Sequence, residues 1–262
     1  MNLADALDYY VRPHTFPLAI KLLKTTDQIP GDARRPVKDL GFKSTICQAI
    51  GIARRIGWKI ALTEVDMSCP FSLIVFGLTK SVPFYEEGRA CLGMYAENPQ
   101  AARRSEAETP KLEYNQYKGL IVSPIFKASD MQPDLYLVFG NSAQTMRLAA
   151  AALYLSGGRI ESSSSARIDC ADEIIQTQLS RDYHYVLPCY GDRMFGLTSD
   201  DEMVFTIPHE KADEIVQGLQ ATHKNGIRYP IPVFVRQEVQ LPEQYNKLME
   251  ILKGDSSSSP SL

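Results

Sequence analysis

Short apolar segments of strand length alternate with capped helical segments along most of this chain. The faces of a sheet must be covered, and helices that lie between the strands in the sequence supply that cover. The alternation therefore predicts an α/β (or α+β) fold with mixed strands and helices. The predicted strands are 17–24, 58–64, 119–126, 133–140, 184–188, 202–208 and 227–235, and the predicted helices are 44–57, 68–78, 98–108, 141–158, 170–179 and 209–226.

The second half of the chain repeats the order of the first half. Gly57 precedes Cys69 by 12 residues, and Gly158 precedes Cys170 by 12 residues. Self-similarity at a fixed spacing is the sequence sign of an internal repeat. We therefore expect two related tandem halves that pack about a pseudo-twofold axis, with Cys69 and Cys170 in equivalent positions.

The expected organisation follows from this repeat. The tail is too polar to bury anything, so we expect it to be disordered. The predicted parts are an N-terminal helix within 1–16, a first α/β repeat at 17–127, a second at 133–235, a C-terminal helix within 236–253 and the tail 254–262.

Charge and apolar patterning exclude two classes of partner. The formal net charge of −3 argues against binding to a phosphate backbone, so we expect no nucleic-acid partner. No apolar run approaches the length of about 20 residues that spans a bilayer, and acids stand where a signal peptide carries a basic start. We therefore expect a cytoplasmic protein with no membrane partner.

Five cysteines are the residues that point most directly to chemistry. An odd number of cysteines in a reducing compartment argues against a disulfide framework and leaves core packing, metal binding or thiol chemistry. A helix N-terminus stabilises a thiolate, so the predicted helix starts at Cys69 and Cys170 favour reactive cysteines. The cysteines are Cys47, Cys69, Cys91, Cys170 and Cys189.

Four stretches carry a resemblance to a known family: CQAIGIARRIG, DMSCP, PDLYLVFGNSAQTMRLAAAALYLSGG and LPCYGDRMFGLTSDDEM. Together they look like the ArCR family of uncharacterised archaeal and bacterial conserved proteins, over about residues 15 to 235. The resemblance implies no established reaction and has no place for Cys91. The positions that it marks as characteristic are Cys47, Cys69, Cys170 and Cys189, with Gly191, Arg193 and Glu202 near the last cysteine.

A cysteine-ligated metal centre is the function that these residues favour. Four thiolates suit an iron–sulfur cluster, with zinc as the alternative, and the absence of tight C-x-x-C pairs argues against a zinc finger. Both the repeat and the resemblance select Cys69, Cys170 and Cys189 as ligands. The resemblance gives Cys47 as the fourth ligand. The repeat gives Cys91 instead, because it places Cys91 and Cys189 in equivalent positions. Arg193 is a candidate anchor for a carboxylate or phosphate.

Two functions stay open on the sequence. The first is a metal or iron–sulfur protein that acts in redox transfer or activates a small anionic substrate, with a redox partner or a small molecule as its partner. The second is a non-catalytic small-molecule-binding or accessory protein in which cysteines fill the core. The nucleotide-binding and serine-hydrolase signatures are absent, and both functions allow a homo-oligomer.

Overall fold

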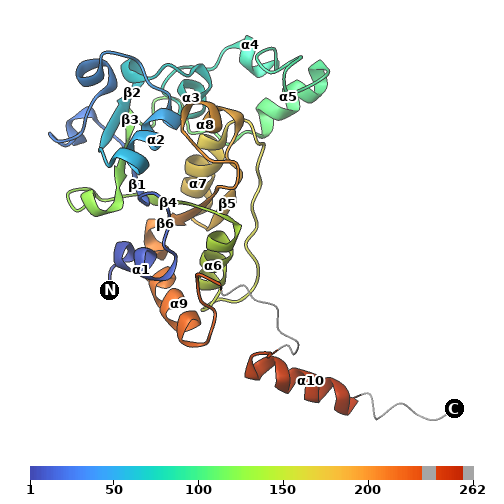
Figure 1. Cartoon of the computed structure of the whole chain (residues 1–262). Coiled ribbons are helices and arrows are strands. Elements are labelled where there is room, and N and C mark those ends of the chain that lie inside the picture. Colours follow the sequence, from blue (N-terminus) through green and yellow to red (C-terminus); the bar gives the residue numbers. More distant parts are fainter. Residues whose placement is uncertain (232–239, 256–262) are drawn as a thin grey trace.

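A six-stranded antiparallel sheet runs through the protein (Figure 1), whose computed structural model describes residues 1–231 and 240–255. The strand order is β2-β3-β1-β4-β6-β5. All six strands fall within predicted segments, and all but β5 are largely apolar runs that the fold buries almost completely. They are β1 (Leu18–Leu23), β2 (Ile60–Thr63), β3 (Gly119–Pro124), β4 (Leu135–Gly140), β5 (His184–Val186) and β6 (Met203–Pro208).

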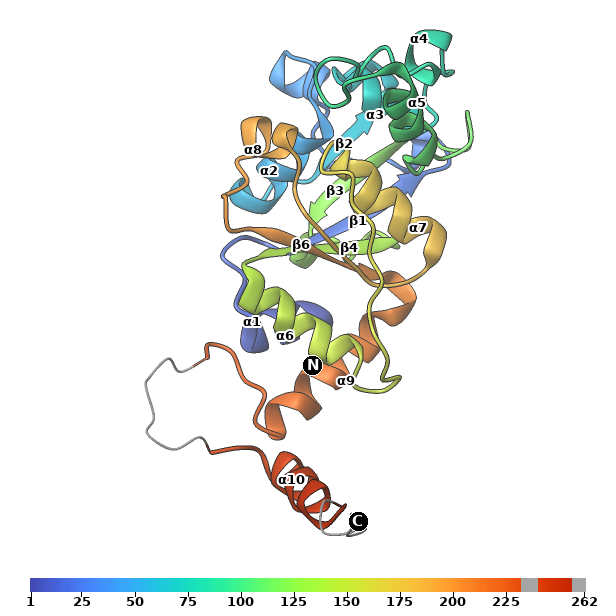
Figure 2. The ribbon, with the colours of Figure 1, turned by 90° about the vertical axis from the view of Figure 1, so that its right-hand side faces the viewer.

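Helices cover both faces of this sheet (Figure 2). One face packs against α1 (Leu3–Tyr10), α6 (Ser142–Ala152) and α9 (Ala212–Lys224). The other packs against α2 (Ile46–Ile56), α3 (Pro70–Val75) and the π-helical turn η5 (Ala171–Ile175) that leads into α7 (Gln176–Ser180). Outside these layers lies α8 (Tyr190–Phe195), which packs against α2. The helices α4 (Pro83–Glu86) and α5 (Pro99–Glu108) also lie outside them. The short helical turns are η1 (Thr26–Gln28), η2 (Pro36–Leu40), η3 (Glu64–Asp66), η4 (Ile125–Lys127) and η6 (His209–Lys211).

Local signals explain where the long helices begin and end. Before α2, the Thr45 hydroxyl accepts a hydrogen bond from Gln48 N (3.0 Å) and the Gln48 side chain accepts one from Thr45 N (2.9 Å). This reciprocal capping box satisfies two backbone donors that a helix start leaves free. At the other end, Gly57 adopts φ 81°, a left-handed conformation in which glycine has no Cβ penalty.

The predicted tandem halves each supply three neighbouring strands, β1 to β3 and β4 to β6. The predicted match of Cys69 with Cys170 is wrong, however, because Cys69 follows the edge strand of its half whereas Cys170 precedes the edge strand of the other. In addition, α2 and α6 lie on opposite faces of the sheet. The pseudo-twofold packing stays a prediction.

Several boundaries differ from those predicted. The helix expected over 68–78 ends at Val75, the helix expected over 141–158 ends at Ala152, and α8 was not among the predicted helices. Of the expected closing strand 227–235, the described part 227–231 is not a strand, and the rest lies outside the described residues. The C-terminal helix is α10 (Glu243–Asp255), and most of the expected tail lies outside the described residues.

A helix that crosses a bilayer needs about 20 mostly apolar residues. Within 1–231 and 240–255, none is both long enough and apolar enough to cross a membrane.

Candidate functional site

Four of the five cysteines line one cavity of about 290 Å³. Cys47 lies in the first turn of α2, and Cys69 is the residue from which α3 begins. Cys170 directly precedes η5, and Cys189 directly precedes α8. The four helical segments therefore point their N-terminal ends at one region.

A close approach of two backbones brings Cys47 near Cys189. A Cβ atom on Gly51, in α2, would lie 2.6 Å from the carbonyl oxygen of Gly196, which ends α8. Only glycine permits that distance, so α2 and α8 pack backbone against backbone. Their starts then lie side by side, and a Cβ on Gly191 would lie 3.4 Å from Cys189 Sγ and 3.9 Å from Cys47 Sγ.

Asp169 joins two of the cysteine-bearing segments. Its Oδ1 accepts a hydrogen bond from Cys170 N (2.9 Å), and its Oδ2 accepts one from Cys189 N (3.1 Å). The Cys189 thiol also donates to Oδ1, with Sγ and Oδ1 3.0 Å apart. The thiol of Cys170 contacts a third segment, because its Sγ lies 3.6 Å from Ser72 Oγ of α3.

A cluster of buried acids surrounds these thiols. Cys47 Sγ and one carboxylate oxygen each of Asp169 and Asp192 all lie within 4.8 Å of one another. Asp192 is 1% exposed and Glu173 is fully buried. Among the described residues, Asp192 Oδ2 and both carboxylate oxygens of Glu173 have no hydrogen-bond partner. Unpartnered buried carboxyls are costly unless they are neutralised by a proton or a cation.

Burial and these acids raise the pKa of three thiols. Burial raises the pKa of Cys47, and the negative charges of Asp192 and Asp169 raise it further. Burial is also the largest cause of the raised pKa of Cys170 and of Cys189, and the negative charge of Asp169 is the next largest. The expected stabilisation of a thiolate by the helix start is therefore wrong for Cys170, because burial and a neighbouring carboxylate outweigh the helix N-terminus.

The same surroundings act on the acids. Burial raises the pKa of Asp192, and the charge of Asp169 adds to the effect. Burial also raises the pKa of Glu173, with Asp192 and Asp169 as further causes. In the absence of a bound cation, the cluster is therefore expected to hold protons.

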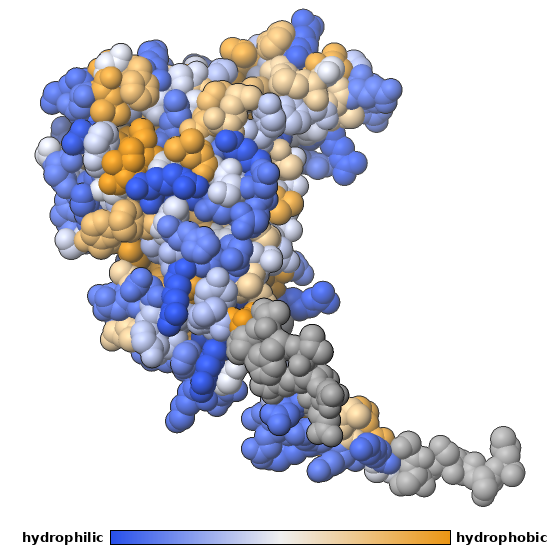
Figure 3. Space-filling view, in the orientation of Figure 1, coloured by the Kyte–Doolittle hydropathy of each residue, from blue (hydrophilic) through white to orange (hydrophobic). Residues whose placement is uncertain are grey.

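The walls of the cavity are apolar and reach the surface. Figure 3 shows apolar side chains gathered over the part of the molecule that holds α2, α3 and α8. Except for half-buried Phe71, the large wall residues are exposed. These walls, which we call the apolar rim, are formed by Phe71, Met94, Tyr95, Tyr190, Met194 and Phe195.

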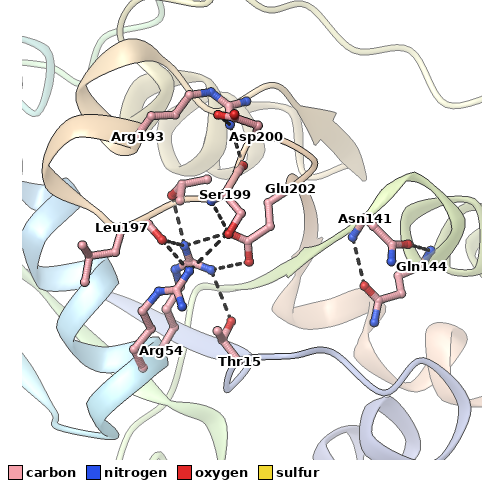
Figure 4. A network of polar contacts seen from close by, with 11 residues as sticks. Thr15, Arg54, Asn141, Gln144, Arg193, Leu197, Ser199, Asp200 and Glu202 are labelled. Atoms are coloured by element: carbon pink, nitrogen blue, oxygen red, sulfur yellow. Dashed lines mark hydrogen bonds and ion pairs between the residues drawn. The ribbon is translucent and has the colours of Figure 1, made fainter.

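Arg193 does not line the cavity. Its guanidinium donates to the carbonyl oxygen of Ser199 and lies 3.9 Å from a carboxylate oxygen of Asp200 (Figure 4). Glu202 does not line the cavity either, and the fully buried Arg54 holds it with hydrogen bonds of 2.7 and 3.0 Å. The cationic side chain that does line the cavity is Arg167.

Cys91, the alternative fourth ligand, lies elsewhere. It is buried between α4 and α5, where its thiol donates to the carbonyl oxygens of Gly88 (3.4 Å) and Ala102 (3.8 Å). It is absent from the cavity lining. The four cysteines that converge are therefore the four that the family resemblance marks.

Comparison with known proteins agrees with that resemblance. Residues 6–218 match the family described as uncharacterised ArCR. The chain belongs to the ArCR family. An uncharacterised protein of Methanocaldococcus jannaschii is 25% identical to it over 209 residues, which cover 78% of this chain and 86% of the relative. No solved structure matches the chain.

The acids of this ArCR protein were not among the predicted site residues. Asp169 and Glu173 flank Cys170, and Asp192 follows Cys189 by three residues. Residues three or four apart share a helix face, so this spacing was the available signal. These three acids were not predicted, because the spacing alone does not separate a buried acid from an exposed one.

Proposed function

We propose that this ArCR protein binds a metal ion or an iron–sulfur cluster through Cys47, Cys69, Cys170 and Cys189. The observation that carries the proposal is that these four thiols, from four separate segments, line one cavity. Four thiolates are the usual ligands of structural zinc and of [4Fe–4S] clusters. Cysteines that merely filled the core would have no reason to converge.

The buried acids support a cation at this place. Asp192 and Glu173 carry carboxylate oxygens without partners in the described part of the chain. A bound cation offsets negative charge and favours the deprotonated thiols that ligate it. The residues therefore fit the centre in the kind of donor they offer. In the described part of the chain, the group whose donor atoms lie within 4.8 Å of one another is Cys47 with Asp169 and Asp192.

The role proposed for the centre is electron transfer or activation of a small molecule in the cavity. A cluster supplies an electron, and a metal with an open position polarises a bound group. The partners are then an electron donor or acceptor and a small molecule. Five cysteines without a disulfide fit a reducing compartment, so we place the protein in the cytoplasm.

A non-catalytic small-molecule-binding protein is the second candidate. The raised pKa values of Cys47, Cys170 and Cys189, with burial as the largest cause, favour this function, because protonated buried thiols behave as small apolar side chains. In that case the cavity alone binds the ligand and no metal takes part.

Metal and sulfide analysis of anaerobically purified protein tests the choice. We expect stoichiometric iron with acid-labile sulfide and a brown colour, or stoichiometric zinc in a colourless protein. Cys189→Ser and Cys47→Ser are each expected to lose most of that metal, because a missing ligand weakens binding by about tenfold or more.

Cys91→Ala is the matched control, since Cys91 is buried, as Cys189 is, but lies outside the cavity. It should retain the metal of the wild type. A wild-type protein that is folded but free of metal, or equal loss of metal in Cys91→Ala, would contradict the proposal in favour of the second candidate.

A further inference from the structure

We infer that the cysteine cavity takes an uncharged, apolar small molecule and not an anion. This inference deepens the proposed function, because it names the class of molecule that lies beside the proposed centre. It starts from the apolar rim, whose aromatic and thioether side chains make up the large walls of the cavity. Such walls bind the apolar body of a ligand, and a few polar groups then orient it.

The described part of the chain offers no free cationic side chain to an anion in this cavity. Among the described residues, Arg167 is the one cationic side chain that lines the cavity. Its two terminal nitrogens bind the two carboxylate oxygens of Glu106 at 3.0 and 2.7 Å, and both side chains are almost fully buried. This bidentate pair uses the edge with which arginine recognises carboxylates and phosphates.

The guanidinium group of Arg167 also lies against two aromatic rings of the cavity wall. Its guanidinium carbon lies 5.6 Å from the ring centre of Phe71 and 6.0 Å from that of Tyr95. Both rings belong to the apolar rim. The arginine therefore supports the position of two wall residues rather than offering a charge to a ligand.

The other titratable side chains of the site are acidic. Asp169 lines the cavity, and Asp192 and Glu173 are buried close behind it. If four thiolates bind one divalent cation, the negative charge of the ligands still exceeds the charge of the metal. An anion that entered would meet like charge in a poorly hydrated site, which disfavours it strongly.

Size and access fit a small ligand. A volume of about 290 Å³ lies at the lower end of the range for small-molecule sites. The exposure of Met94 (67%) and Met194 (52%) places the rim at the surface, so a ligand can reach the thiols without unfolding of a layer.

The test compares 1-naphthol, which is uncharged at neutral pH, with 1-naphthoate, which has the same rings and a carboxylate. Binding is measured by calorimetry on the full chain as purified anaerobically, with the metal content determined on the same sample. Methionine methyl groups labelled with carbon-13 report the location, because ring currents shift the signals of Met94 and Met194. We expect 1-naphthol to bind at least about tenfold more tightly than 1-naphthoate.

Met194→Glu and Met146→Glu form a matched pair of variants. Both methionines are exposed (52% and 44%), but Met146 lies on α6, across the sheet from the cavity. A carboxylate at 194 should weaken 1-naphthol binding by about tenfold, since it adds a charge to an apolar wall. The same change at 146 should leave the affinity unaltered.

Equal or tighter binding of 1-naphthoate, or wild-type affinity in Met194→Glu, would overturn the inference. These results are separate from those that decide the proposed function. A metal-loaded protein that prefers 1-naphthoate refutes the ligand class alone. A metal-free protein that binds 1-naphthol with the expected selectivity refutes the metal centre alone.

Discussion

One short side chain, Asp169, fixes the positions of two proposed ligands. Each of its oxygens accepts a hydrogen bond from the backbone N–H of a different cysteine, Cys170 or Cys189. Because a carboxylate offers acceptors on both oxygens, it satisfies both segments at once. An amide in its place has one oxygen and one NH₂ group, and the NH₂ group would face a backbone N–H.

We therefore predict that Asp169→Asn lowers the metal content several-fold and the free energy of unfolding by about 1–3 kcal/mol. Metal analysis and urea denaturation measure the two effects. Asp172→Asn is the control, because Asp172 accepts from Ser165 N at 2.9 Å and lies outside the cysteine cavity. Equal loss of metal in both variants would show that Asp169 has no special role in positioning the cysteines.

The pair formed by Arg54 and Glu202 predicts a dependence of stability on pH. Burial alone would raise the pKa of Glu202, but the hydrogen bonds of Arg54 and the N–H of Ser199 bring it below its ordinary value. A carboxyl with a lowered folded-state pKa stabilises the fold above its unfolded pKa of about 4.3, and that contribution is lost as the pH falls through the folded-state value.

Glu202→Gln should accordingly lower the free energy of unfolding at pH 7 by about 3 kcal/mol, because it leaves a buried guanidinium without its partner charge. The difference from the wild type should shrink as the pH falls below about 4. Denaturant titrations between pH 3 and 7 measure it. A difference that stayed constant over this range would contradict the assigned charge of Glu202.

At this scale the sequence identified the cysteines that line the cavity better than it identified their surroundings. Cysteines are few, so four of them in the resemblance were conspicuous. Asp192 and Arg193 were misjudged because their direction depends on α8. Successive residues of a helix point about 100° apart, so Asp192 turns toward Cys47 while its neighbour Arg193 reaches Ser199.

Among the elements, a clear local pattern decides how well the sequence predicts structure. The strands and the long amphipathic helices α2 and α9 were predicted because their apolar pattern and caps are local. The short α4 and α8 were not predicted, since isolated helices of this length are unstable and form through packing. For α8 that packing is against α2, which no local pattern encodes.

Gly51→Ala tests the contact between these two helices. The added methyl group would lie 2.6 Å from the Gly196 carbonyl oxygen, so α2 and α8 must separate. We expect a loss of about 1–3 kcal/mol in stability, measured by denaturation, with a lower metal content. Gly31→Ala is the control, since nothing lies within 4 Å of a Cβ there, and it should not change either quantity. An unchanged Gly51→Ala protein would show that the backbones are not in close contact.

For the whole molecule, the order of the strands was beyond what the sequence could predict. β1 pairs with β3 and with β4, which places the first strand of each half at the centre of the sheet. The equal spacing of Gly57 to Cys69 and of Gly158 to Cys170 favoured one alignment of the halves, but the strand that precedes Cys69 has its counterpart after Cys170. Spacing along the chain carries no information about which edge a strand joins.

The C-terminal segment gives the last prediction. Every side chain described from Gln240 to Gly254 is exposed, and the match to the ArCR family ends at residue 218, before α10. A segment whose side chains are all largely exposed buries little apolar surface, so it contributes little to the stability of the body. Deletion of 240–262 should therefore leave the melting temperature within about 2 °C of the wild-type value and the metal content unchanged, as measured by calorimetry and metal analysis. A fall of more than about 5 °C would mean that α10 packs against the body in solution, and a selective loss of metal would tie this helix to the cysteine cavity.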